Sequence, residues 1–362
     1  MRSRTRNLIV FVVVLLVIAA IGLAIYLRKR AAPEPARLLP DSDMVFYVNL
    51  RTVRHLTSFG KYPVKPEEPE YQQFVQATGF QFERDLEEAA FAVHYVNRPP
   101  EKKGMPPTTE ARYSEIFVGK FDGQRLTEYL RKLSKAEERY HDTEIFVIPV
   151  EDRTVRVAIL SVDSVAASNV DDPNVIRGMI DRARAAAMPF QGPDVVREYY
   201  RKVPIGSLVW AIARIPAGAG PPAGSVTLPG GFQLQFIPAN STVVASARYL
   251  GSIHARADIY TPSDAEAKKL AEQATAFLAI FRSAQVTTET GGADPDVKAA
   301  LDSLKVDRQG LRTTLSATIP VAFFQKLLSE PPDVTGEKQE EQQPTPAPKK
   351  QVPSKKKTAP AK

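Results

Sequence analysis

Twenty consecutive residues without a charge, Leu8 to Leu27, constrain this chain more than any other feature of its sequence. As an α-helix, such a run spans about 30 Å, which matches the hydrocarbon core of a bilayer. A buried helix of this length in a soluble protein would need protein on every face. We therefore expect a transmembrane helix over residues 8–27, preceded by a cytoplasmic N-tail over residues 1–7.

A cleaved signal peptide is the alternative interpretation of the same run. Residues 22–24, Gly-Leu-Ala, form a poor cleavage site, and the cluster Arg-Lys-Arg at residues 28–30 is typical of an anchor boundary. Positive residues lie on both sides of the run in similar number, so the positive-inside rule gives only a weak preference for either orientation. Three arginines in the short N-tail favour a single pass through the inner membrane with the rest of the chain outside the cytoplasm.

The net charge of +7 is unevenly distributed. Residues 1–37 carry seven Lys and Arg against one Glu, and residues 330–362 carry seven Lys against five acidic residues. Residues 38–329 hold 34 basic and 35 acidic residues, so the middle of the chain is close to neutral. This argues against a nucleic-acid-binding domain, which needs a basic surface on the fold itself. The absence of cysteine excludes disulfides, thiolate nucleophiles and cysteine-ligated metals.

Strands and helices alternate irregularly after a Pro/Ala-rich tether over residues 28–37. The motif LPDSDMVFYVNL predicts a strand, and FVGKFDGQRLTEYLRKL predicts a strand followed by a helix that Asp122 caps. TEIFVIPV and RTVRVAILSV predict a hairpin. Hairpins interspersed with helices favour an α+β fold with antiparallel sheets and packed helices. The proline-rich stretches at residues 97–112 and 216–231 are expected as loops.

Two related α+β subdomains, residues 38–202 and 203–329, are a further expectation. A strand followed by a capped helix occurs at residues 115–133 and again at residues 252–281, and the opening strand has a loose echo in VPIGSLVWAIARI. The offsets of the two pairs differ, so no strict repeat is present.

The tail over residues 330–362 is rich in Pro, Gln, Glu and Lys and has almost nothing to bury, which predicts disorder. It is interpreted either as a solubilising segment or as a weak contact for an anionic polymer or membrane surface. The residues of that possible polyanion contact are Lys349, Lys350, Lys355, Lys356, Lys357 and Lys362. No aromatic residues lie among them, which argues against base stacking.

The sequence motifs of common active sites are missing. There is no phosphate-binding loop, no His-Glu-x-x-His and no Gly-x-Ser-x-Gly. His141-Asp142-x-Glu144 has the residue types of a metal site but reads as a polar turn, and the Asp pairs at residues 41–43 and 294–296 read as turns or helix caps. We predict no catalytic, cofactor-binding or metal-ligating residue, although distant carboxylates can meet in space.

The order of these motifs resembles an uncharacterised family of N-terminally membrane-anchored bacterial proteins, known only as a domain of unknown function. The resemblance rests on LLPDSDMVFYVNL, TGFQFERDLEEAAFAV, FVGKFDGQRLTEYLRKL, DPNVIRGMIDRARAAA and VVREYYRKVPIGSLVWAI. It covers residues 38–215 well and residues 240–329 loosely. It implies an exported domain and transfers no catalytic residue.

These observations predict a single-pass, membrane-anchored, extracytoplasmic binding or scaffold protein of the bacterial envelope, without catalysis or a cofactor. Its partners would be the membrane, through Leu8 to Leu27, and a protein or anionic envelope polymer; no nucleic acid is expected. One alternative is an envelope hydrolase that uses dispersed carboxylates, which needs a pocket where those groups converge. Another is a membrane protein that faces the cytoplasm with a polyanion-binding tail.

Overall fold

A computed structural model describes residues 31–57, 69–98, 108–151, 153–185, 192–216, 225–227, 233–235, 237–288 and 295–322. The apolar run at residues 8–27 and the predicted tail at residues 330–362 lie outside this part of the chain. Among the helices within it, none combines the length and the apolar character that crossing a bilayer requires.

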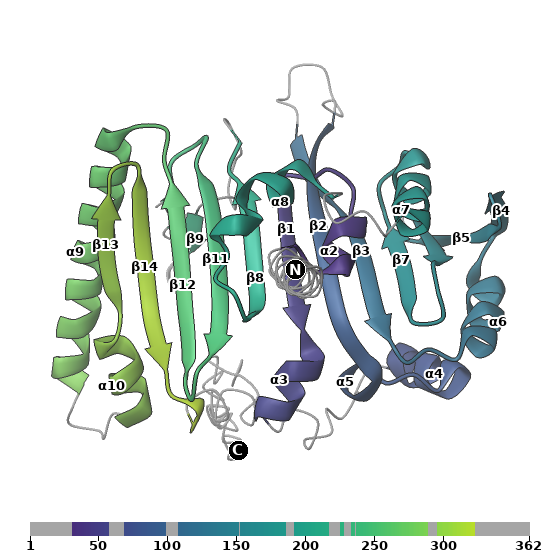
Figure 1. The fold of residues 1–362 in the computed structure, drawn as a ribbon, viewed down its shortest axis with the longest axis horizontal. Coiled ribbons are helices and arrows are strands. Elements are labelled where there is room, and N and C mark those ends of the chain that lie inside the picture. The colour runs from purple at the N-terminus through teal and green to yellow at the C-terminus, as the bar shows by residue number, and fades with distance from the viewer. Residues whose placement is uncertain are drawn as a thin grey trace, which may run out of the picture.

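A mixed α and β architecture with a large antiparallel sheet is the main feature of the fold (Figure 1). Twelve strands form this sheet in the order β13-β14-β12-β11-β8-β1-β2-β3-β7-β6-β5-β4, and two short strands, β9 and β10, pair separately. The strands are β1 (Met44–Asn49), β2 (Leu86–Arg98), β3 (Thr108–Gly119), β4 (Ala136–Tyr140), β5 (Thr143–Val150), β6 (Arg153–Ile159), β7 (Ser164–Ser168), β8 (Ser207–Arg214), β9 (Ser225–Thr227), β10 (Gln233–Gln235), β11 (Thr242–Tyr249), β12 (Ile253–Tyr260), β13 (Lys305–Gln309) and β14 (Arg312–Ile319).

The helices connect these strands and cover parts of both faces. They are α2 (Glu34–Leu38), α3 (Leu50–Thr57), α4 (Pro69–Thr78), α5 (Phe82–Asp85), α6 (Gly123–Leu133), α7 (Asn174–Arg184), α8 (Asp194–Tyr199), the 3-10 turn η2 (Tyr200–Lys202), α9 (Asp264–Thr288) and α10 (Pro295–Asp302). In α6, the Asp122 side chain accepts a hydrogen bond from the Arg125 backbone N–H at 3.1 Å, so the predicted cap is confirmed.

The two faces of the sheet follow from the alternation of side chains along each strand. On β1, Val45 and Tyr47 are buried on one face, and Phe46 points to the other. We call the first of these face A and the second face B. Helices α2, α7 and α8 pack on face A, where the largest buried cluster lies. Helices α6 and α9 pack on face B, at opposite ends of the sheet.

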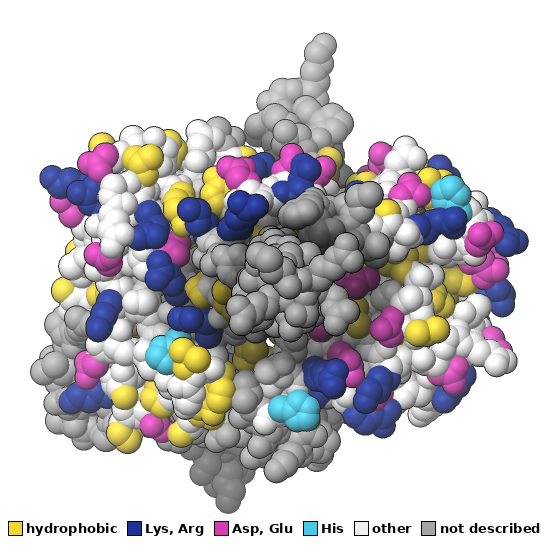
Figure 2. Space-filling view, viewed as in Figure 1, with side chains coloured by type: hydrophobic (Ala, Val, Ile, Leu, Met, Phe, Trp, Pro, Cys, Tyr) yellow, Lys and Arg dark blue, Asp and Glu magenta, His cyan; other side chains and the backbone are white. Residues whose placement is uncertain are grey.

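The face A core contains a line of large side chains under the helices. Trp210 on β8 has 1% of its surface exposed and stacks on Tyr47, with ring centroids 5.5 Å apart. Tyr200, from the turn after α8, meets the same indole edge-on at 5.2 Å. Figure 2 views face A and shows charged side chains on the strands at one side of these helices.

The two halves of the sheet have similar topology. In each, three successive neighbouring strands lead into a helix on face B, and later strands return to extend the sheet outward: β1-β2-β3 lead into α6, and β8-β11-β12 lead into α9. The first strands of the two halves, β1 and β8, pair antiparallel at the centre. One continuous sheet therefore crosses the expected boundary between residues 202 and 203.

The structure corrects the expected tether. Residues 34–38 form α2, with proline in its first turn, and Pro35, Ala36 and Leu38 are buried against the sheet. The linking segment therefore ends at Pro33, because a proline-rich stretch can begin a helix as well as a loop. The expected loop at residues 97–112 is also shorter than predicted, since β3 begins at Thr108 and β2 continues to Arg98.

Candidate functional site

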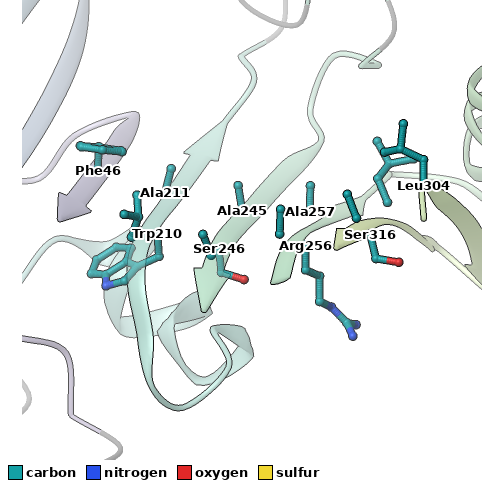
Figure 3. A pocket seen from close by; sticks show the side chains of 14 residues that line it. Phe46, Trp210, Ala211, Ala245, Ser246, Arg256, Ala257, Leu304 and Ser316 are labelled. Carbon is teal, nitrogen blue, oxygen red and sulfur yellow. The ribbon is translucent and has the colours of Figure 1, made fainter. Parts of the chain in front are cut away.

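The candidate site is an open apolar groove of about 370 Å³ on face B. Its floor lies on the neighbouring strands β8, β11, β12 and β14, with Phe46 of β1 at one end and Leu304 at the other (Figure 3). The side chains that face the groove are Phe46, Val209, Ala211, Ala245, Ala247, Ala255, Ala257, Leu304, Leu315 and Ala317. In Figure 3, Trp210, Ser246, Arg256 and Ser316 point to the opposite side of the strands.

Local sequence explains this floor. Ala245-Ser246-Ala247 on β11 and Ala255-Arg256-Ala257 on β12 alternate a methyl side chain on face B with a polar one on face A. The strand register then aligns the methyl groups across the sheet. Phe46 is paired with Ala211, Ala211 with Ala245, Ala245 with Ala257, and Ala257 with Leu315. Because neighbouring strands lie about 4.8 Å apart, these side chains form one row.

One wall of the groove is fixed by α9 and the end of α10. The Thr313 hydroxyl of β14 donates to the Ala267 carbonyl of α9 at 3.1 Å, and Ala267 and Leu270 are buried. The Ser303 hydroxyl donates to the Thr318 carbonyl at 3.0 Å and holds the chain that carries Leu304. Among the residues whose side chains the structure describes, those that line the groove all belong to strands or to the segment after α10, and none belongs to a helix.

The same row of paired residues continues beyond the groove to a carboxylate. Phe46 is paired with Phe91, and Phe91 with Glu115 of β3. Burial raises the pKa of Glu115 above its ordinary value, with no charged neighbour contributing. Among the described residues that line the groove, Arg256 is the one titratable side chain, and it points to the opposite side of the strands. The geometry of the groove therefore suits the binding of an apolar surface.

A serine–histidine arrangement on face A escaped the sequence analysis. His94 Nε2 lies 3.1 Å from the Ser114 hydroxyl, which in turn lies 3.0 Å from the Ser168 hydroxyl. Burial lowers the pKa of His94, against smaller opposing effects of the Asp43 charge and the Asp41 backbone. Ser114 has no exposed surface, so its hydroxyl cannot meet a substrate in this structure. The three residues are a hydrogen-bond network between strands β2, β3 and β7.

The other polar residues singled out by the sequence lie in separate places. His141 occupies a turn with φ 52° and pairs with Asp181 of α7 at 3.3 Å, and Asp142 is 3.8 Å from Arg184. Asp41 accepts a hydrogen bond from the Asp194 backbone N–H. Within the described ranges, no three His, Asp or Glu side chains are grouped as a metal would require. The six tail lysines lie outside those ranges, so their proposed contact stays a prediction.

Buried carboxylates in the described strands are mostly paired with arginine. Asp258, 3% exposed, accepts two hydrogen bonds of 2.8 Å from Arg256 and one of 2.6 Å from the Thr314 hydroxyl. Alternation along β12 would suggest that the side carrying His254 and Asp258 faces solvent, but Asp258 is buried there by its arginine and threonine partners. On the other half, Arg112 is buried between Glu110 and Asp171. Such pairs satisfy buried charge and do not mark an open catalytic pocket.

Comparisons with known proteins give no family. A scan against protein-family models finds no match, and a search of curated proteins finds none. Among solved structures, three crystal forms of a protein called TP0453 are similar over most of their length. Form III has a TM-score of 0.42 at 10% identity, covering 82% of this chain and 98% of that one. Form I has a TM-score of 0.41 at 12% identity, covering 83% and 98%, and form IV a TM-score of 0.40 at 11% identity, covering 82% and 95%. Likenesses this distant carry no argument about function.

Proposed function

We propose that this chain is a membrane-anchored, extracytoplasmic binding protein of the bacterial envelope, and that the groove on face B receives an apolar helix of a partner protein. The observation that carries the proposal is the row of alanine methyl groups that lies between two helix-covered ends of the same sheet face and that no described helix lines. The anchoring rests on the apolar run from Leu8 to Leu27.

The shape and chemistry of the groove favour a helix as its occupant. Face B already receives α9 at one end and α6 at the other, so a further helix over β8, β11 and β12 would continue an existing layer. Alanine side chains allow a helix to approach the strands closely, and larger apolar residues of the partner would fill the space. An amphipathic helix laid in an apolar groove is a common mode of peptide recognition. A lipid would find no charged side chain directed into the groove among its described lining residues to hold a headgroup.

The groove is tested by site-specific photocrosslinking of the full-length chain in cells. A photoreactive residue replaces Ala247 in the groove, and a matched one replaces the exposed Lys305 on face A. We expect an adduct from position 247 whose crosslinked peptide, identified by mass spectrometry, is an amphipathic helical segment of another protein. The variant Ala245→Phe, which fills the floor, should reduce that adduct several-fold and leave the thermal unfolding midpoint within a few degrees.

Two results would contradict this assignment. Adducts with lipid, or with the chain's own residues, would give the groove a different occupant. Equal adducts from positions 247 and 305 would remove the groove's special role. The location is tested separately with Val162→Cys, a position with 88% of its surface exposed in a chain that has no other cysteine. Labelling by a membrane-impermeant thiol reagent before lysis is expected; protection until lysis would place the domain in the cytoplasm.

A further inference from the structure

The point where the described chain begins lies on face A, near the middle of the sheet. α2 packs across β1, β2 and β3 there and lies in front of the sheet in Figure 1. Only residues 28–33 separate Leu27, the end of the apolar run, from Glu34, the first residue of α2. Fully extended, the seven steps from Leu27 to Glu34 span about 25 Å. A bilayer that holds residues 8–27 therefore lies within that distance of the middle of face A.

Face B is beyond the reach of this linking segment. β2 is the seventh of the twelve strands, so the nearer sheet edge, β4, is five strand spacings or about 24 Å away. The path around a strand end is about 21 Å, half the length of the 13-residue β2. Passing from face A to face B adds about 10 Å to either path, for the layer packed on the sheet, so both paths are longer than about 30 Å. The bilayer can meet face A, while the groove on face B opens away from it.

Exposed positive charge is concentrated on one half of face A. Figure 3 shows Ser316 and Arg256 on the side of the strands opposite the groove, which is face A. Strand register pairs Lys305 with Ser316. It also pairs Arg248 with His254 and Arg312 with Tyr260, which alternate with the groove residues Ala255 and Ala257 along β12. Cross-strand partners share a face. The basic side chains here are Arg248, Arg256, Lys305 and Arg312 on the strands and Arg197, Arg201, Lys202 and Arg214 at α8, η2 and β8. The acidic ones are Asp258 and Asp307 on the strands and Asp194 and Glu198 on α8.

The other half of face A is balanced by contrast. There Arg177 of α7 pairs with Glu138 at 3.1 Å, and Arg184 lies 3.8 Å from Asp142. On the basic half, neither Arg248 nor Lys305 lies within ion-pair distance of an acidic side chain in the described part of the chain, and Figure 2 shows Lys and Arg side chains along these strands. An excess of four positive charges within reach of a bilayer matches anionic lipid headgroups, each such residue near the surface being worth about 1 kcal/mol.

We infer that face A docks on the bilayer that holds the apolar run, with the basic half, Arg248 and Lys305 above all, against anionic lipid headgroups. This orientation rests on the proposed anchoring. It turns the groove toward the aqueous compartment, so that the groove takes its helix from a soluble or opposing protein and not from within the same membrane.

The inference is tested with the full chain reconstituted in vesicles of phosphatidylcholine, with and without phosphatidylglycerol, that carry a headgroup-attached quencher. A fluorophore is placed by Gln309→Cys on face A, or by Lys268→Cys on α9 at face B; both positions are exposed. In anionic vesicles we expect quenching at position 309 to exceed that at position 268 at least about twofold, and the excess to shrink with added salt.

The double variant Arg248→Glu/Lys305→Glu should remove the excess quenching at position 309. The control variant Lys132→Glu/Lys135→Glu makes the same charge change at the end of α6 and just after it, and should leave the excess quenching intact. Equal quenching at both labels, or undiminished quenching in the first variant, would overturn the inference. Loss of the protein from the vesicles on alkaline extraction would instead contradict the anchoring itself, so the two failures are distinguishable.

Discussion

The two faces of the central strands are built from neighbouring residues yet have opposite character. On β8, Trp210 faces α2 and α8 and has 1% of its surface exposed, whereas the next residue, Ala211, faces the open groove. Face A places large side chains such as Trp210 in a packed core, whereas face B of β8, β11 and β12 carries mainly alanine side chains in the groove. The central strands are therefore stabilised mainly by packing on face A, while the helices of face B pack at the two ends of the sheet, and the middle of face B is left for binding.

The largest expected effect comes from emptying the face A core. Trp210→Ala removes the indole that stacks on Tyr47 and meets Tyr200, and should lower the free energy of unfolding by about 3–5 kcal/mol. Urea unfolding followed by circular dichroism measures the change. Phe46→Ala, at the end of the groove and only partly buried, is the matched variant from the other face. An equal loss for both variants would abolish the contrast between the faces.

Local features of the fold could be predicted from sequence because they depend on nearby residues. The helix α6 carries the expected cap at Asp122 and buries Leu126 and Leu130, which are four residues apart on one face. The helix α7 buries Ile176, Met179 and Ile180 at the same helical spacing. Strands β4, β7 and β13 were missed: β4 and β13 are polar edge strands, and β7 is a run of five small residues. β4 and β13 are held by hairpin pairing with the next strand, and β7 by pairing with β6 and β3, while their own side chains show little apolar alternation.

The groove and the buried networks could not be predicted, because residues far apart in the sequence create them. Alternation along β12 puts Ala255 and Ala257 on one face and Arg256 on the other, but it does not show which face the helices cover. That depends on where α2 and α8 pack. The hydrogen bonds among His94, Ser114 and Ser168 likewise need β2, β3 and β7 to be neighbours.

A second variant tests whether face B is tightly packed outside the groove. A Cβ added at Gly119, at the end of β3, would lie 2.6 Å from the Asp85 carbonyl oxygen and 3.2 Å from a ring carbon of Phe80. The backbone must shift, so Gly119→Ala should cost about 1–3 kcal/mol in urea unfolding. Gly123→Ala in the same region, with nothing within 4 Å of the added Cβ, is the control and should be neutral or slightly stabilising. A neutral Gly119→Ala would mean that face B is loosely packed throughout.

Stability should change with pH in opposite directions for a buried residue on each face, and His94 is the one on face A. Burial lowers the pKa of His94, so between its folded pKa and its ordinary value the unfolded chain binds a proton that the folded chain does not. Stability should therefore fall as the pH drops through about 6.5. His94→Gln should flatten this part of the stability curve, while Ser114→Ala, which keeps the buried imidazole, should not. An unchanged slope in His94→Gln would assign the pH dependence to other groups.

Glu115 on face B should behave in the opposite way and with the smallest effect. Burial raises the pKa of Glu115 in the folded chain. As the pH rises above the ordinary pKa of a glutamate, the unfolded chain loses its proton before the folded chain does. The free energy of unfolding therefore falls until the pH passes the pKa of the folded chain. At pH 7, above the ordinary pKa, the raised pKa of Glu115 lowers the stability of the folded chain, and no charged partner contributes to that pKa. Glu115→Gln should then stabilise the protein at pH 7 and make no difference below about pH 4, where both states hold the proton. Thermal melts at both pH values measure this, with Glu128→Gln on the exposed side of α6 as the control. A loss of stability at pH 7 would show that the carboxylate makes a favourable contact on face B, and the apolar row from the groove would then end in a polar binding position.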